Sequence, residues 1–177
     1  MVVAEPEHVI EAIRETAKRE IMPRFRRLGG GDVAEKRPND LVTTADIEAE
    51  KRLSAALEAL LPGSAVVGEE AAEADPGSLA ALSSQGPVWL VDPIDGTRNF
   101  VNEKPCFATM VALCIAGETV EGWIHDPITD QTTWAALGKG AWLGGERVRA
   151  AAPAALPAMT GSVSYKLRRR FKASRAA

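Results

Sequence analysis

Five acidic residues of this sequence stand at the predicted boundaries of helices and strands instead of along helix surfaces. They are Asp46, Glu69, Glu70, Asp92 and Asp95. Carboxylates that converge on one place repel one another, so either one is protonated or a cation lies among them. The two histidines, His8 and His125, are distant in the sequence, and ligands that are all oxygens favour Mg2+, Mn2+ or Ca2+ over zinc. The pattern therefore predicts a divalent-cation site.

The run Asp92-Pro93-Ile94-Asp95-Gly96-Thr97 adds a place for an anion. Pro93 fixes the backbone between the two aspartates, and Gly96 permits a tight bend and close approach by a ligand. If a helical turn begins at 96–100, its N–H groups, with the Thr97 hydroxyl, face an anion such as phosphate. Two cations roughly 3.5–4 Å apart beside that phosphate would form a two-metal hydrolysis site.

Each motif by itself has a simpler interpretation. An Asp-Pro-x-Asp-Gly sequence is often an ordinary β-turn, and Glu69-Glu70 alone would be a solvated pair. Thr43 and Asp46 fit the capping box of a helix N-terminus. The conjunction of these motifs in one chain, in this order and after matching strands, favours the functional interpretation.

The elements that must position these residues are predicted as follows. A helical rhythm runs from 7 to 28 and ends at Gly29-Gly30-Gly31, and a second helix runs from about 45 to 60 before Pro62-Gly63. The apolar face of the second helix is predicted to comprise Ile47, Leu53, Ala56, Leu57, Leu60 and Leu61. A short strand at 65–67 leads to Glu69, and residues 71–86 are predicted as a short helix and a loop. The apolar run 88–91 predicts a strand that is buried on both faces and leads into Asp92.

A meander of strands follows, at 107–115, 119–125 and 131–136, with a shorter one at 140–143. Helices followed by consecutive strands predict an α+β layered domain with a largely antiparallel sheet. Residues 1–150 are interpreted as one metal- and phosphate-binding domain. Residues 151–177 are interpreted as the start of a C-terminal portion, with a connector over 150–161 and a strand predicted to begin at Gly161–Ser164.

Composition excludes several other classes of protein. Hydrophobic residues make up 46% and charged residues 25%, which is typical of a globular domain, and the apolar runs are of strand length, so no membrane span is expected. The N-terminus has acids where a signal peptide has basic residues, which favours a cytoplasmic protein. Cys106 and Cys114 lie in an apolar stretch and are predicted to be buried thiols instead of a disulfide.

The net charge of −3 hides a basic C-terminal stretch, which contains Lys166, Arg168, Arg169, Arg170, Lys172 and Arg175. Without these six, 15 basic side chains face 24 acidic ones, a balance of −9. An acidic body suits a protein that binds divalent cations and argues against a nucleic-acid partner. The basic stretch is interpreted as a solvated helix face in preference to a nucleic-acid contact.

The motifs together resemble those of the inositol monophosphatase family. The resemblance covers nearly all of residues 5–150, and it rests on Asp40–Asp46 with Lys36 before it, Gly68-Glu69-Glu70, Trp89–Phe100 and Gly138–Trp142. It implies a layered α/β sandwich of the inositol monophosphatase and fructose-1,6-bisphosphatase type. It also implies Mg2+-dependent hydrolysis of a small-molecule phosphate ester by a metal-activated water, and a homodimer in the full-length protein. The resemblance further implies roughly two or three Mg2+ ions per site, with Mn2+ as a substitute and inhibition by Li+.

The same resemblance implies residue roles. Glu69 and Asp92, with the backbone carbonyl of Ile94, would bind the first metal, and Asp92 and Asp95 the second. Asp46 and Thr97, counted with Glu69 as catalytic, would orient and activate the attacking water. The substrate phosphate would lie against Ile94, Asp95, Gly96 and Thr97, held by the amides of the last two. Glu70 stays open between a metal-site residue and a supporting or surface acid.

The sequence departs from the family pattern at its C-terminal side. No aspartate follows Asp130 and the one later acid is Glu146, whereas the family places a further metal-binding aspartate in a Trp-Asp motif there. We therefore expect a fragment or truncated product with weakened second-metal binding and feeble or absent turnover. Inositol 1-phosphate is the default substrate; Arg98 is loosely associated with histidinol phosphate, and Asn99-Phe100 fits the inositol branch better. 3′-Phosphoadenosine 5′-phosphate and fructose 1,6-bisphosphate are further candidates. The competing hypotheses are an inactive metal-binding regulatory or assembly module and a purely structural α+β domain.

Overall fold

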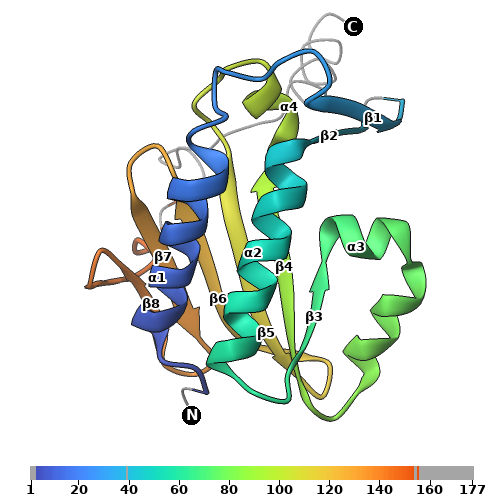
Figure 1. Cartoon of the computed structure of the whole chain (residues 1–177). Coiled ribbons are helices and arrows are strands. Elements are labelled where there is room, and N and C mark those ends of the chain that lie inside the picture. Colours follow the sequence, from blue (N-terminus) through green and yellow to red (C-terminus); the bar gives the residue numbers. More distant parts are fainter. Residues whose placement is uncertain (1–2, 39, 154, 156–177) are drawn as a thin grey trace, which may run out of the picture.

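A mixed seven-stranded sheet organises the chain in the computed structural model, which describes residues 3–38, 40–153 and 155 (Figure 1). Its strands follow one another in sequence and in space: β3 (Ala65–Gly68), β4 (Pro87–Asp95), β5 (Ala108–Ile115), β6 (Glu118–Asp126), β7 (Gln131–Ala136), β8 (Gly140–Leu143) and β9 (Glu146–Val148). The β3–β4 pair is parallel, and every later pair is antiparallel. The largely antiparallel sheet predicted from the sequence is therefore confirmed.

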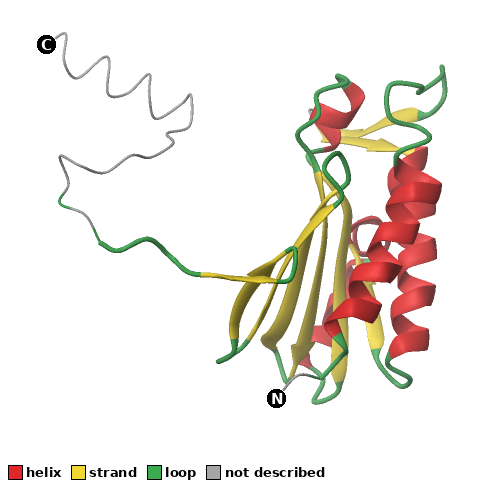
Figure 2. Ribbon diagram, turned by 90° about the vertical axis from the view of Figure 1, so that its left-hand side faces the viewer, coloured by secondary structure: helices red, strands yellow, loops and turns green. Residues whose placement is uncertain are grey.

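Two long helices, α1 (Pro6–Thr16) and α2 (Thr44–Leu60), lie side by side on one face of this sheet, which gives the layered α+β arrangement that the sequence predicts (Figures 1 and 2). The main core lies between them and the middle strands, where the rings of Trp89 and Trp123 are 5.9 Å apart. Its other fully buried side chains include Val9, Ile13, Leu53, Leu57 and Leu113. The N-terminal part of α2 packs in a second core, where Ala45 and Ala49 lie with Ile94 and Phe100.

The N-terminal helix is shorter than the predicted span of 7–28. After α1 the chain makes one π-helical segment, η1 (Ala17–Ile21), and then turns. Pro23 has no N–H to donate and its ring clashes with the preceding turn, so a regular helix cannot pass through it. Phe25 still packs as the periodicity suggested, with its ring 5.5 Å from Phe100 and 5.0 Å from Phe107.

The predicted bounds of α2 are right to within one residue, but its predicted apolar face is only partly right. Leu53 and Leu57 are buried, whereas Ile47 and Leu60 are each 38% exposed. The buried face begins instead with small and acidic residues, which are Ala45, Asp46, Ala49 and Glu50. An acid buried on this face needs hydrogen-bond partners, and both acids have them, as described below.

The strands predicted at 107–115, 119–125, 131–136 and 140–143 agree with β5 to β8 to within one residue. Strand β9 was not predicted, nor was the antiparallel hairpin of β1 (Val33–Arg37) and β2 (Asp40–Thr43), which lies beside the N-terminus of α2. Residues 71–86, predicted as a short helix and a loop, belong mostly to two short helices, α3 (Glu69–Ala74) and the 3-10 helix η2 (Pro76–Ser83).

The remaining predictions have mixed outcomes. Cys114 is buried as predicted, but Cys106 is exposed, because it lies in the loop between the short helix α4 (Thr97–Val101) and β5; both are free thiols. No helix among the described residues combines the length and apolarity needed to cross a membrane. The basic stretch and the strand predicted from Gly161 lie outside the described residues, as does most of the predicted connector.

Candidate metal and phosphate site

The acids singled out in the sequence lie at one end of the sheet, on two neighbouring segments and one helix. The edge arm is β3 and α3 (residues 65–74), and the inner arm is β4 and α4 (residues 87–101). Because β3 and β4 are parallel, their carboxyl ends meet at the same edge, and Gly68 pairs with Val91. Glu69 therefore leaves its strand beside Asp92, and the start of α2 lies at the same end (Figure 1).

The Asp-Pro-x-Asp-Gly sequence of the inner arm is not an ordinary β-turn, which was the simpler interpretation of this motif. Strand β4 continues through Pro93 to Asp95, with a shift of register against β5 between Asp92 and Asp95. The fully buried Thr109 of β5 donates a hydrogen bond from its hydroxyl to the Pro93 carbonyl at 2.8 Å and so fixes the irregular segment. Ile94 is 1% exposed, which leaves the Asp92 and Asp95 side chains on a strand that cannot shift easily.

Gly96 then bends the chain into α4. Its φ of 94° lies in the left-handed region, which a residue with a Cβ adopts only under strain, and an added Cβ would lie 3.2 Å from the Cys106 carbonyl oxygen. The amides of Asn99 and Phe100 donate to the Gly96 carbonyl, so a helical turn begins here as the sequence predicted. The first N–H groups of such a turn have no acceptor within the helix itself.

Asp46 joins α2 to the inner arm. Its Oδ2 accepts a hydrogen bond from the backbone N–H of Thr43 at 2.8 Å, and its own backbone N–H donates to the Thr43 hydroxyl at 3.4 Å, which forms the predicted capping box. The Thr43 hydroxyl also donates to Oδ2 at 2.5 Å. Asp46 Oδ1 lies 3.3 Å from the hydroxyl of Thr97, which is also 3.0 Å from the Ile94 carbonyl. Burial raises the pKa of Asp46 in spite of these hydrogen bonds. One carboxylate thus serves the helix cap and contacts Thr97.

Asp92 is the most perturbed acid of the site. Burial, followed by the charge and the hydrogen bond of Glu69 and the charge of Asp95, raises the pKa of Asp92 to about 8. Its Oδ1 is buried and has no hydrogen-bond partner. Glu69 and Asp95 are more exposed and lie towards solvent. The arrangement therefore has an excess of negative charge, which a proton or a cation between the carboxylates would relieve.

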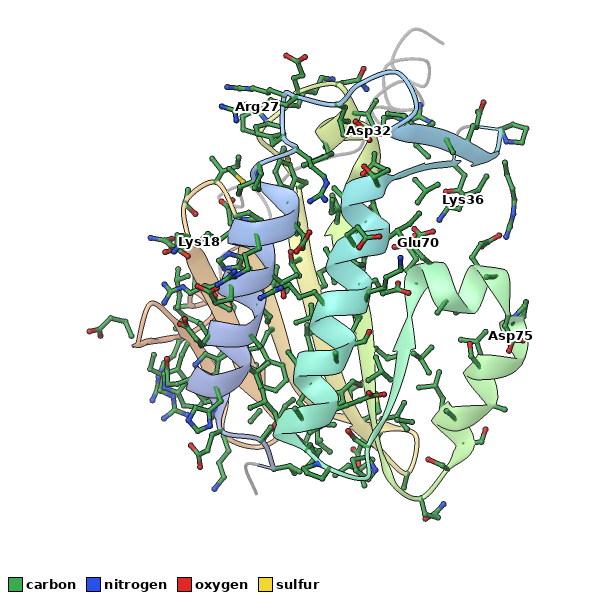
Figure 3. The ribbon with its side chains drawn as sticks, viewed as in Figure 1. Lys18, Arg27, Asp32, Lys36, Glu70 and Asp75 are labelled. Atoms are coloured by element: carbon green, nitrogen blue, oxygen red, sulfur yellow. The ribbon has the colours of Figure 1, made fainter. Side chains whose placement is uncertain are left out.

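Lys36 of the β1–β2 hairpin supplies one positive charge, and it is directed to Glu70 (Figure 3). Its Nζ lies 2.9 and 3.0 Å from the two Glu70 oxygens and 3.8 Å from Glu69. Burial acts to lower the pKa of Lys36, but the acids around it raise it on balance. Burial raises the pKa of Glu70, and Lys36 offsets only part of that effect. Glu70, left open by the sequence, is thus an acid half-buried against a lysine.

Two residues that hold this site, Glu50 and Thr109, were not predicted from the sequence. Glu50 lies four residues after Asp46 on α2, and its carboxylate accepts the backbone N–H groups of Glu70 and Ala71. The signal that could have revealed it is an acid in helical phase with Leu53 and Leu57, where an apolar side chain is the norm. Thr109 gave no comparable signal, because threonine is common on strands.

The donor set fits a hard divalent cation in its chemistry. Glu69, Asp92, Asp95 and the Ile94 carbonyl offer only oxygen atoms, and one of these, Asp92 Oδ1, is buried without a partner. Among the described residues, no three acidic, histidine or cysteine side chains are gathered closely enough to form a complete ligand cluster. The carboxylates therefore lie at one end of the sheet without a closed coordination shell.

Comparison with known proteins finds relatives that match most of this chain. The model of the inositol monophosphatase family matches residues 5–174. The chain is 39% identical over 146 residues to an inositol-1-monophosphatase of Caulobacter vibrioides, covering 81% of this chain and 54% of that protein. It is 32% identical over 125 residues to a fructose-1,6-bisphosphatase/inositol-1-monophosphatase of Aquifex aeolicus, covering 71% and 45%. The chain thus spans about half the length of the curated relatives it matches.

Solved structures give the same result for the fold. An inositol monophosphatase of Thermotoga maritima superposes with a TM-score of 0.68 at 29% identity, covering 82% of this chain and 53% of that one. A Staphylococcus aureus enzyme, SaIMPase-II with bound inositol monophosphate, superposes with a TM-score of 0.63 at 26% identity, covering 85% and 51%. The same enzyme has also been solved with bound 2′-AMP. The layered sandwich predicted from the sequence motifs is therefore confirmed.

Proposed function

Since the chain belongs to the inositol monophosphatase family, we propose that it carries the metal- and phosphate-binding part of a Mg2+-dependent phosphomonoesterase. The proposed substrate class is a small polyol or sugar phosphate, with inositol 1-phosphate as the first candidate. Relatives named as inositol-1-monophosphatases and the neighbour solved with inositol monophosphate support this choice. Fructose 1,6-bisphosphate, histidinol phosphate and 3′-phosphoadenosine 5′-phosphate are alternatives within the same reaction class.

The observation that carries the proposal is the state of Asp92. A carboxyl group with an unpartnered buried oxygen, beside a second carboxyl and within the field of a third, is unfavourable unless a positive charge joins it. We propose that Glu69, Asp92, Asp95 and the Ile94 carbonyl hold Mg2+. When bound, Mg2+ would supply charge against the phosphate oxygens and lower the pKa of a nearby water.

The residues of the chain itself have two further proposed roles. The Thr97 hydroxyl, within reach of Asp46, can accept a hydrogen bond from the attacking water while its own proton is held by the Asp46 carboxylate. Asp46 is buried and fixed by Thr43, so this pair is oriented before substrate arrives. The amides of Gly96 and Thr97 are proposed to hold the phosphate oxygens, because the left-handed Gly96 turn exposes the start of α4.

Mg2+ binding tests the site directly. The purified chain should melt at a higher temperature with MgCl2 than with EDTA, and a Mg2+ concentration one hundred times the dissociation constant would add about 2.7 kcal/mol to the free energy of unfolding. Asp95→Asn should weaken this stabilisation, whereas Asp75→Asn, just after the far end of α3, should keep it. Equal melting temperatures with and without Mg2+ would contradict the proposal.

Phosphate release tests the reaction separately. Mg2+-dependent release from inositol 1-phosphate that is abolished in both Asp95→Asn and Thr97→Ala would support the phosphomonoesterase. Comparison with fructose 1,6-bisphosphate and 2′-AMP would rank the substrates. Because the chain spans about half of its relatives, feeble release is expected, and the comparison with the two variants decides the matter. Mg2+ binding with release no faster than in Asp95→Asn and Thr97→Ala would favour the alternative of a metal-binding module for this chain.

A further inference from the structure

A second buried acid on α2, Glu50, contacts the edge arm in a way that the proposed chemistry does not explain. It is 8% exposed, and both of its carboxylate oxygens accept backbone hydrogen bonds. Oε2 accepts from the N–H of Glu70 at 2.8 Å, and Oε1 accepts from the N–H of Ala71 at 2.9 Å. These are first-turn N–H groups of α3, which have no acceptor inside their own helix.

The chain is shaped to admit this carboxylate. Gly68 precedes α3 in an extended conformation and makes no side-chain cap. A Cβ added at Gly68 would lie 2.2 Å from Glu50 Cδ and 2.5 Å from each carboxylate oxygen, so any larger residue would displace Glu50. Helix α2 therefore supplies from 20 residues away the cap that α3 cannot make for itself.

Two independent contacts thus fix the start of α3. Lys36 holds the side chain of Glu70, while Glu50 holds the backbone on which Glu69 and Glu70 are mounted. The Glu50 contact bears more directly on Glu69, because the peptide that it binds is the one between Glu69 and Glu70. The direction in which Glu69 faces Asp92 follows from the orientation of that peptide.

We infer that Glu50 is a positioning residue, which sets the Glu69 carboxylate against Asp92 for binding of the divalent cation. This inference rests on the function proposed above. It also means that α2 holds both arms, since Asp46 fixes the inner arm through Thr97, and one turn later Glu50 fixes the edge arm through the N–H groups of Glu70 and Ala71. A shift of either acid would alter the separation between the two groups of ligands.

The test is the Mg2+ affinity of Glu50→Gln, measured by titration calorimetry on the full chain. Glutamine keeps the shape but presents an amide N–H2 to one of the two N–H donors, so α3 should turn and Mg2+ affinity should fall about tenfold or more. Leu53→Ala is the matched control, since it truncates a fully buried residue one turn further along α2. It should lower the melting temperature while leaving the Mg2+ dissociation constant unchanged.

A pair of substitutions at Gly68 checks the mechanism. Gly68→Ala should weaken Mg2+ binding as Glu50→Gln does, because the new methyl group displaces the carboxylate. Adding Gly68→Ala to a Glu50→Ala variant should change the Mg2+ dissociation constant little further, as expected for two residues that act through one contact.

The outcomes separate this inference from the proposed function. Absence of Mg2+ binding by the unsubstituted chain would overturn both. Normal Mg2+ binding by the unsubstituted chain and an unchanged dissociation constant in Glu50→Gln would overturn the positioning role alone. The positioning role is also overturned if Leu53→Ala weakens Mg2+ binding as much as Glu50→Gln does. It is overturned as well if Glu50→Gln fails to fold where Leu53→Ala folds. In either case Glu50 would be a purely structural residue.

Discussion

The two arms of the site are built from similar sequence, a strand that ends in acids, yet they are held in different ways. The inner arm lies between β3 and β5, and Thr109 ties its irregular segment to the neighbouring strand. The edge arm belongs to the outermost strand of the described sheet, and side chains from α2 and the β1–β2 hairpin hold its helix.

This difference indicates a division of roles. A strand with neighbours on both sides and a buried Ile94 can move only if the sheet opens, so Asp92 and Asp95 are fixed by the fold. Glu69 and Glu70 stand on a helix of six residues that would adopt other orientations without Glu50 and Lys36. The inner arm should therefore respond to substitution with a global change in stability, and the edge arm with a local change in position.

The largest expected effect arises where the arms meet, at Asp92. The pKa of Asp92 is about 8 in the folded protein and 3.8 is its ordinary value. The protonated carboxyl group therefore contributes its full stability below pH 3.8, and this contribution is lost as the pH rises through about 8. Without metal, the free energy of unfolding should decrease as the pH rises from 3.8 to about 8. Asp92→Asn should remove this dependence and be more stable at pH 8 by on the order of 3 kcal/mol.

Urea unfolding at a series of pH values, in EDTA and in MgCl2, measures this effect. Glu58→Gln, an exposed acid on α2, is the control and should keep the pH dependence of the unsubstituted chain. Mg2+ should reverse the order at pH 8, because it stabilises a charged Asp92 and not an asparagine. If the pH dependence of the free energy of unfolding in EDTA is the same for Asp92→Asn and Glu58→Gln, the carboxylates of the two arms do not repel one another at Asp92.

The next effect concerns the inner arm alone. Thr109→Val keeps the shape of a fully buried side chain but leaves the Pro93 carbonyl without its hydrogen bond. The free energy of unfolding should fall by about 2 kcal/mol, because a buried acceptor loses its partner. Chemical denaturation measures the change, and Thr133→Val, half-buried on β7, should stay within about 0.5 kcal/mol. Equal effects at both positions would mean that the irregular segment of β4 does not depend on Thr109.

The smallest effect on global stability is expected in the edge arm. Lys36→Met removes the cation from Glu70 and should lower the free energy of unfolding by about 1 kcal/mol at pH 7. The loss should shrink as the pH falls, and it should do so above the ordinary pKa of a glutamate, because burial raises the pKa of Glu70 and a protonated Glu70 forms no ion pair with the lysine.

Amide hydrogen exchange gives the sharper measurement for this variant. The amides at the start of α3 should exchange faster in Lys36→Met, with those of β4 and β5 unchanged, and the exposed Lys139→Met should alter neither. Faster exchange spread over β4 would contradict the separation of the two arms.

The sequence motifs predicted much of the fold because the signals for turns, strands and helix starts are local. Turn residues and alternating strands placed β5 to β8 correctly, and Thr43 with Asp46 located the start of α2. The hairpin β1–β2 was missed, since its strands are short, polar and outside the main sheet, where hydrophobic alternation is weak. The apolar face of α2 was misjudged because it was traced through apolar residues alone. Asp46 and Glu50 are also buried on this face, and their contacts with Thr97 and with the start of α3 explain why.

The sequence by itself determined the order of the motifs, the position of Glu69 directly after a strand and of Asp46 at the start of a helix, and the membership of a family that shares these motifs. It could not determine which acids face one another. That depends on the parallel pairing of β3 with β4, which places Glu69 beside Asp92, and on the packing of α2, which brings Asp46 to Thr97 and Glu50 to α3. Such contacts join residues 20 to 51 positions apart, and the free energy that selects them comes from burial of the common core, to which each local segment contributes only a part.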